Sequence, residues 1–224
     1  LLLTMTGAFA TLFGVLSAWF VSAFEFPLRR LLSFALVLPL AIPSYLAAYA
    51  FGEFLDFTGP VQTGIRALFG YQSIRDYWFP DIRSLGGAVL VLGSVLYPYV
   101  YLSTRAAFGL QGRVTSEAAR TLGAGTLRSF LSVQLPMARP AIIIGLALVM
   151  METLNDIGAV EYLGVRTLTF TIYETWLNRG NLGGATQIAS ILVLIVAALI
   201  IIERKARSRQ RYVAGKATAM AQRS

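Results

Sequence analysis

The segment SEAARTLGAGTLRSFLSVQLPMARP, from Ser116 to Pro140, lies between two apolar stretches and is the longest part of this chain that does not resemble a membrane span. Thr115 or Ser116 can cap a helix whose first turn carries Glu117, where the helix dipole favours a carboxylate. Gly123 is expected to end this short helix, because glycine readily adopts the left-handed conformation found at helix ends. The segment therefore predicts a rigid helical knob between two membrane spans.

A second helix is expected in the same segment, capped by Thr126. Its apolar residues recur at helical spacing, and they are Leu127, Phe130, Leu131 and Leu135. Pro136, followed by Pro140, is expected to close this helix before the next apolar stretch. Ala118 and Ala119 carry so little bulk that a partner surface can approach the backbone of the first helix closely. A helical hairpin without a partner is the structural alternative.

The spacing of the residues in this segment indicates a protein family more specifically than the amino-acid composition does. Glu117, Ala118 and Ala119 are followed after three residues by Gly123, and after nine more by Val133 and then Leu135-Pro136. This pattern, EAA-x3-G-x9-hydrophobe-x-LP, resembles the EAA motif of permease subunits of bacterial binding-protein-dependent ABC importers, where it forms a cytoplasmic coupling helix. The resemblance implies that the segment docks into a cleft on an ATPase through Glu117, Ala118, Ala119, Gly123, Leu135 and Pro136.

The resemblance also implies the other parts of such a transporter. These are an ABC ATPase subunit dimer that uses ATP and Mg, a periplasmic substrate-binding protein, and a second permease half, which is a second copy or a homologous half. The chain contains no phosphate-binding loop of the form G-x-x-x-x-G-K-[ST], so ATP is expected to be handled by another subunit. The chain itself is expected to be a permease subunit and no enzyme, without catalytic residues, bound cofactors or a tightly bound metal.

Composition places the chain in the membrane class. Of its 224 residues, 56% are hydrophobic and 13% are charged, and the mean hydropathy is +0.66, which is too apolar for a soluble domain of this length. The absence of His and Cys excludes a conventional catalytic triad or thiol nucleophile. The net charge of +8 could suggest nucleic acid, but the basic residues lie beside the apolar stretches, so no nucleic-acid partner is expected.

Five apolar stretches are long enough to cross a hydrocarbon core of about 30 Å. They are Leu1 to Phe24, Leu31 to Phe51, Leu85 to about Thr104, Ala141 to about Val160 and Ala185 to Ile202. The fold class is therefore predicted as all-α, a polytopic membrane protein with about five transmembrane helices, and the resemblance implies the type I ABC importer permease fold. Because the chain opens inside an apolar run, a sixth helix is expected to be missing at the N-terminus.

Residues 1–202 are expected to form one half of a pore, with residues 105–140 as the cytoplasmic coupling loop and residues 203–224 as a basic cytoplasmic tail or linker. With the loop in the cytoplasm, 14 of the 19 basic residues lie on that side, which agrees with the positive-inside rule. The five on the outer side are Arg66, Arg75, Arg83, Arg166 and Arg179. The resemblance implies that the chain lies in the bacterial inner (cytoplasmic) membrane, as a multi-pass protein in contact with the lipid bilayer.

The second span contains Pro39 and Pro43, which predict a kink against the bundle interior. Such a kink suits the wall of a translocation pathway, although a purely structural kink is the alternative. Tyr97 and Tyr99, beside Pro98 in the third span, are further candidates for the pathway.

The fourth span carries Glu152, Asn155 and Asp156 at positions i, i+3 and i+4, which predicts that they share one helical face. Acidic groups at membrane depth are costly unless they face a cavity or a partner. One interpretation is an acidic, oxygen-rich wall for a cation or a docking partner. The other is that these residues pack the outer helix end through hydrogen bonds to Ser, Tyr or Arg neighbours.

Residues 52–84 are predicted to be an outer loop of mixed charge, with aromatic residues that fit a membrane interface. Its charged residues are candidates for docking the binding protein, and they are Arg66, Arg75, Asp76, Asp81 and Arg83. The alternative is a solvated face with an interfacial aromatic belt.

Further stretches, such as LPLAIPSYLAAYAFG in the second span and METLNDIGAVEYLGV in the fourth, resemble the ferric-iron subgroup of these permeases. The main expectation is therefore ferric iron delivered by a periplasmic binding protein, although that subgroup typically joins two halves in one polypeptide. Sulfate or molybdate, thiamine and phosphonate are alternative substrates. A secondary transporter in which Glu152 and Asp156 carry protons is a further alternative.

Overall fold

A computed structural model describes residues 1–121 and 125–221, and the side chains of residues 1–110, 125–202 and 204. All regular secondary structure in the described residues is helical, which confirms the all-α prediction. Four segments there are long and apolar enough to cross a membrane, namely Leu2–Ala23, Leu85–Leu110, Thr126–Asn155 and Leu182–Ile202. The number is five if a bent helix pair over residues 29–69 is counted as one further span. With four or five such segments, the chain is a polytopic membrane protein.

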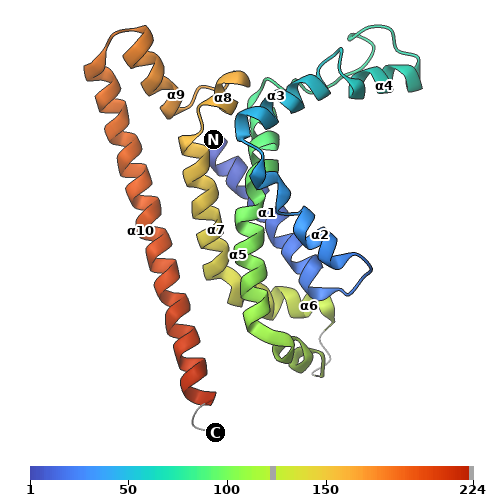
Figure 1. The fold of residues 1–224 in the computed structure, drawn as a ribbon, viewed down its shortest axis with the longest axis vertical. Helices are drawn as coiled ribbons and strands as arrows, with labels where there is room; N and C mark the ends of the chain where they lie inside the picture. The colour runs from blue at the N-terminus through green and yellow to red at the C-terminus, as the bar shows by residue number, and fades with distance from the viewer. Residues whose placement is uncertain (122–124, 222–224) are drawn as a thin grey trace.

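Helix α5 (Leu85–Thr121) lies at the centre of the bundle (Figure 1). Helices α1 (Leu2–Ala23) and α7 (Leu135–Asn155) both pack on it and on each other. Helix α10 (Leu182–Ala221) lies along α7 and α9 (Leu168–Tyr173) at one side. In the apolar part of α5, 67% is buried, against 6% for α10, so α5 forms the core and α10 keeps most of its apolar surface exposed.

Glycines let the three central helices approach closely. A Cβ atom added to Gly14 of α1 would lie 2.8 Å from Val100 Cβ in α5, and one added to Gly145 of α7 would lie 2.7 Å from Val100 Cα. Val100 is fully buried. Helices α1 and α7 therefore contact the same turn of α5, as is common between membrane helices, where close van der Waals packing drives association.

The second predicted span, from Leu31 to Phe51, is not one kinked helix. It consists of α2 (Arg29–Ala35), the 3-10 helix η1 (Leu38–Ala41) and α3 (Ser44–Leu55). The parts before and after the break meet at 100°. Pro43 lies at this break, and Pro39 lies just before it in η1. Because proline lacks an N–H and disfavours a helical residue before it, the helix breaks at Pro43 instead of bending.

The predicted outer loop of residues 52–84 is partly helical. After α3 ends, α4 (Pro60–Phe69) begins with a proline at its first position and ends at Gly70, whose φ is 73°. In Figure 1, α3 and α4 form an arm that extends sideways from one end of the bundle. We call residues 44–84 the outer arm.

The segment between the third and fourth spans also differs from the prediction. Helix α5 continues unbroken to Thr121, so no separate short helix begins at Thr115 or Ser116. Gly125, and not Thr126, occupies the cap position of α6 (Thr126–Ser129). A π-helical turn, η2 (Phe130–Gln134), then leads directly into α7.

The two prolines of this segment do not close a helix. Pro136 lies in the first turn of α7, where a backbone N–H is not needed, and Pro140 lies inside α7. The fourth span therefore starts before Ala141. It also ends earlier than Val160, because α7 stops at Asn155 and the short helix α8 (Gly158–Tyr162) follows separately.

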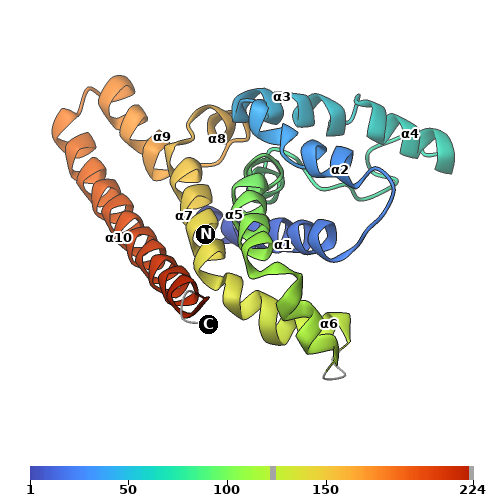
Figure 2. The ribbon, with the colours of Figure 1, turned by 60° about the horizontal axis from the view of Figure 1, so that its bottom comes forward.

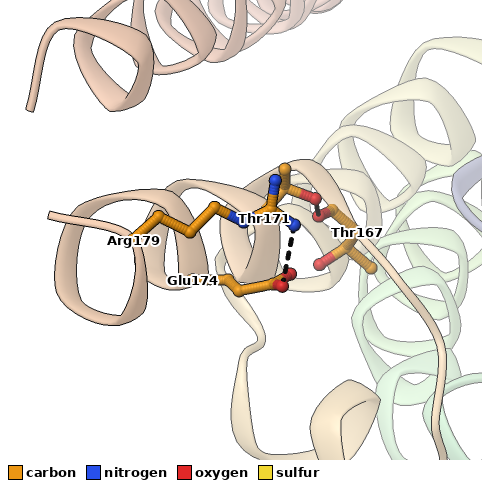
Figure 3. A network of polar contacts seen from close by, with 4 residues as sticks. All are labelled: Thr167, Thr171, Glu174 and Arg179. Carbon is orange, nitrogen blue, oxygen red and sulfur yellow. Dashed lines mark hydrogen bonds and ion pairs between the residues drawn. The ribbon is translucent and has the colours of Figure 1, made fainter. Parts of the chain in front are cut away.

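The turn before α10 is held by a small polar network (Figure 3). Thr167 caps α9 by accepting a hydrogen bond from Phe170 N at 3.2 Å, and its carbonyl accepts one from Thr171 Oγ1 at 2.7 Å. In the π-helical turn η3 (Glu174–Asn178), Glu174 pairs with Arg179 at 3.0 Å. Helix α10 then starts at Leu182 and runs on as helix through most of the predicted tail.

Candidate functional site

The predicted coupling loop lies at the end of the bundle opposite the outer arm, where Figure 2 shows α6 projecting beyond the membrane helices. Glu117, Ala118 and Ala119 belong to the last turns of α5; their side chains, and the whole of Gly123, lie outside the described residues. Leu135 and Pro136 are half-buried in the first turn of α7. The structure thus brings the start and the end of the motif to the same end of the molecule.

Phe130 fixes this segment to the bundle. Its ring is 4% exposed and lies 4.6 Å from the ring of Trp19 in α1 and 6.3 Å from that of Phe108 in α5. The sequence predicted Phe130 only as part of an apolar helix face. Its contacts with Trp19 and Phe108 could not be predicted from helical periodicity, because these residues lie on other helices. Phe130 therefore links the segment that contains α6 to two membrane helices.

Two leucines close to Phe130, one in α6 and one in η2, point outward. Leu127 is 60% exposed and Leu131 is 53% exposed. They flank the buried Phe130 on a segment that projects from the bundle. Exposed leucines of this kind are suited to contact with another protein.

Glu152, Asn155 and Asp156 do not share one helical face, because α7 ends at Asn155 and Asp156 has an extended conformation with ψ of 126°. The Asp156 carboxylate accepts a hydrogen bond from Ser44 Oγ at the start of α3. It also accepts hydrogen bonds from the backbone N of Ala159 at 2.9 Å and of Val160 at 3.3 Å.

Asp156 therefore joins α7, the first turn of α8 and the broken second span. This arrangement matches the packing interpretation for Asp156. Ser44 was missed in the sequence, although a serine directly after Pro43 is a common signal for a helix start.

Glu152 lies one turn before the end of α7 and is exposed. Its carboxylate interacts with the hydroxyl of Tyr99 on α5. Tyr97 lies elsewhere, since it is 6% exposed and its ring meets Phe13 of α1 edge to face at 5.0 Å. The structure thus brings Glu152 and Tyr99 together and places Tyr97 in the contact between α5 and α1.

In the outer arm, Arg66 points inward. Its guanidinium lies 4.0 Å from the centre of the Phe57 ring and donates hydrogen bonds to Phe57 O at 2.7 Å and to Tyr77 Oη at 3.3 Å. Tyr77 in turn donates to the buried Gln62 at 2.6 Å. Arg66 therefore links α4 to the residues before it, through Phe57, and to the residues after it, through Tyr77.

Two carboxylates of the outer arm stabilise turns by accepting hydrogen bonds from backbone N–H groups. Asp76 accepts hydrogen bonds from the backbone N of Gln72 at 2.9 Å and of Ser73 at 2.8 Å. These bonds, the one from Ser73 having the larger effect, lower the pKa of Asp76 below its usual value of 3.8. Asp81 accepts a hydrogen bond from Arg83 N at 2.8 Å.

The remaining two arginines of the arm differ in their surroundings. The Arg83 guanidinium lies 5.1 Å from the ring centre of Tyr162 in α8, and the Tyr162 hydroxyl raises the pKa of Arg83. The Arg75 side chain is exposed. Of the five predicted docking residues, Arg75 thus offers its charge to a partner most directly.

Carboxylates in the described part of the chain are dispersed. No group of three or more Asp or Glu side chains there is arranged to hold a metal ion. Glu152 and Asp156, the two that could have formed such a site, have separate partners in Tyr99 and Ser44.

Comparison with known proteins finds relatives of this chain among transport system permeases. The chain is 30% identical over 211 residues to the molybdenum transport system permease protein ModB of Escherichia coli K12, covering 91% of this chain and 89% of that protein. It is 27% identical to the sulfate transport system permease protein CysT of Salmonella typhimurium, over 84% of this chain and 59% of CysT. These relatives do not support the expectation of ferric iron.

The match to a protein family covers most of the chain. Residues 10–212 match the family described as binding-protein-dependent transport system inner membrane component. This range includes the EAA segment and all of the membrane-spanning segments described above except residues 2–9 of α1. The chain is therefore a multi-pass protein of the inner membrane, and it belongs to the family of permease components of binding-protein-dependent ABC importers.

Proposed function

We propose that the chain forms one half of the pore of an ATP-driven importer and that the 116–136 segment transmits the movements of an ABC ATPase dimer to it. The burial of Phe130 between Trp19 and Phe108 is the observation that supports this role most strongly. ATP and Mg are bound by the ATPase, and this chain holds no cofactor. Closure of the ATPase dimer moves α6 as a rigid knob, and Phe130 passes the movement to α1 and α5, so that the pathway alternates between outward and inward access.

A cysteine placed on the exposed face of the knob tests the docking. The chain has no Cys, so Leu127→Cys gives a single reactive site on α6. We expect it to cross-link to a cysteine in the cleft of the ATPase. Leu102→Cys is the matched control, because Leu102 is also exposed, at 41%, but lies on the membrane-spanning part of α5. Equal cross-linking of the two variants would contradict the proposed docking.

For the substrate, we propose a tetrahedral oxyanion, molybdate or sulfate, delivered by a periplasmic binding protein. The support is the similarity to ModB and CysT, which are permease proteins of a molybdenum and a sulfate transport system. A second permease half, a second copy or a homologue, completes the pore. Membership of this family favours transport driven by ATP over a secondary transporter driven by protons carried on Glu152 and Asp156.

Ferric iron is the second candidate, and one observation favours it. Glu152 and Tyr99 place a carboxylate beside a phenol at the contact of α5 and α7, and both are oxygen donors that suit a hard cation. An exposed carboxylate would instead repel a dianion. Transit needs weak contacts, so this pair would assist passage without holding a metal tightly.

Uptake by the reconstituted complex distinguishes the two substrates. Vesicles containing the permease and ATPase are given the binding protein encoded with them and, in turn, labelled molybdate, sulfate or ferric ion. An oxyanion importer takes up one of the first two only when ATP is present, and Glu152→Gln does not reduce this uptake. If the vesicles take up only ferric ion, and Glu152→Gln reduces this uptake, the substrate is ferric iron and not an oxyanion.

A further inference from the structure

A cavity lies between α1 and α2 that none of the proposed transport steps uses. Its volume is about 310 Å³, and it is lined by Leu16, Ser17, Trp19, Phe20, Leu32 and Leu36. Phe20 is 47% exposed and Leu32 is 36% exposed, so the cavity is a groove that opens on the outside of the bundle. Because both helices belong to the predicted membrane crossings, this surface faces lipid.

With the coupling segment in the cytoplasm, as proposed above, the groove lies in the cytoplasmic half of the membrane. Trp19 is four residues from the end of α1 at Ala23, and its ring contacts Phe130 of the coupling segment. Across the groove, Leu32 and Leu36 follow Arg29 at i+3 and i+7. Residues at this spacing lie on one face of a helix, so Arg29 stands on the face that lines the groove, one turn nearer the cytoplasm.

The charge at the mouth of the groove is positive. Arg29 and Arg30 form the first turn of α2, and Arg30 is exposed. Glu25, in the turn that connects α1 to α2, already has an interaction of its own. A polar group lies deeper, since the Ser17 side chain lines the otherwise apolar cavity.

We propose that this groove binds one anionic glycerophospholipid of the cytoplasmic leaflet. An acyl chain fills the apolar cavity, and the phosphate lies against Arg29 and Arg30. Basic residues beside apolar grooves on the cytoplasmic side of membrane proteins are the usual recognition elements for anionic lipid head groups.

The lipid would also support the coupling segment. Trp19 forms the wall of the groove on one side and contacts Phe130 on the other. A bound acyl chain would restrict the movement of the Trp19 ring and hence the position of the Phe130 ring that contacts it. Occupation of the groove should therefore increase the fraction of ATP hydrolysis that results in transport.

Native mass spectrometry of the complex with its ATPase tests the binding. The complex is incubated with equal amounts of phosphatidylglycerol and phosphatidylethanolamine, and the retained lipids are counted. We expect preferential retention of phosphatidylglycerol by the wild type. Arg29→Gln with Arg30→Gln should weaken it by about thirtyfold, because each arginine near an anionic lipid surface contributes about fivefold. Arg105→Gln with Arg139→Gln removes the same charge elsewhere on the cytoplasmic side and should leave retention unchanged.

Three kinds of result would overturn the proposal. Equal retention of both lipids, or equal loss in both double variants, would show that the groove does not distinguish lipid head groups. A cross-link between two copies of the chain through Ser17→Cys would show that a second copy covers the groove. Ser17→Phe, which fills the cavity and leaves both arginines in place, should also abolish the retained phosphatidylglycerol; retention in this variant would contradict the placement of the acyl chain.

Discussion

Ser44 donates a hydrogen bond to Asp156, which lies 112 residues further along the chain. Ser44 is the first residue of α3 after the break in the second span, and Asp156 is the first residue after α7. The same carboxylate accepts the backbone hydrogen bonds of Ala159 and Val160 at the start of α8. One side chain thus sets the relative position of the outer arm and the outer end of the bundle.

Asp156→Asn is expected to destabilise this junction by about 1.5–3 kcal/mol, the usual contribution of hydrogen bonds to a charged group. Ser44→Ala should cost less, about 1 kcal/mol, because it removes one hydrogen bond. Thermal unfolding of the purified complex measures both. The double variant should be less destabilised than the sum, since the two residues share one interaction. Strict additivity, or a loss of uptake per assembled complex without any loss of stability, would favour the pathway role for Asp156.

Gly145→Ala is expected to disturb the contact between α5 and α7. Its Cβ would lie 2.7 Å from Val100 Cα and 2.9 Å from Tyr99 O, and backbone atoms cannot move aside as a side chain can. Overpacking of this kind costs about 1–3 kcal/mol. Gly109→Ala is the control in α5, because a Cβ there meets nothing within 4 Å. Equal stability of the two variants, measured as resistance to detergent unfolding, would show that α7 does not pack this closely.

Phe130→Ala should uncouple the ATPase from transport. It removes the contacts to Trp19 and Phe108 and costs about 3–5 kcal/mol, as for other buried Phe residues, most of it local to the knob. We expect ATP hydrolysis to continue while uptake per ATP falls. Phe34→Ala is the control, since Phe34 is 65% exposed and lies on α2, away from the coupling segment. If Phe130→Ala lowers both rates equally, the residue only stabilises the fold.

The pKa of Asp76 should be below 3.8, because the backbone N–H groups of Ser73 and Gln72 stabilise its charged form. A carboxyl group with a lowered pKa in the folded state contributes stability above its unfolded pKa and loses it as the pH falls through the folded value. The 72–76 turn is thus expected to persist until the pH is below 3.8. Carbon NMR of labelled aspartate, with Asp76→Asn for assignment, measures this pKa; a value above 3.8 would contradict the turn geometry.

Arg75→Glu is expected to slow docking of the binding protein. The exposed charge of Arg75 on the outer arm can steer association, and such charges act mainly on the association rate at low salt. Stopped-flow measurements over a salt series should show the largest difference from wild type at the lowest ionic strength. Arg75→Lys keeps the charge and should behave as wild type. A rate that does not depend on salt in either variant would assign Arg75 to a merely solvated face.

The sequence by itself determined the fold class, the approximate spans and the family. Apolar stretches of about 20 residues must form helices in lipid, where every backbone polar group needs a partner within the segment. The positions of Glu117, Gly123 and Pro136 could be recognised in one dimension, because the motif is a matter of spacing along one short segment.

Only the tertiary structure decided how these elements meet. Pro39 and Pro43 predicted a disturbance of the second span, but whether a proline bends or breaks a helix depends on what satisfies the freed carbonyls around it. The prediction that Glu152 and Asp156 share one helical face was wrong, because α7 ends between them. The Asp156 carboxylate instead accepts hydrogen bonds from Ser44 and from the backbone of α8. Contacts such as Ser44 with Asp156, or Trp19 with Phe130, join residues more than 100 positions apart, and helical periodicity describes only neighbours along the chain.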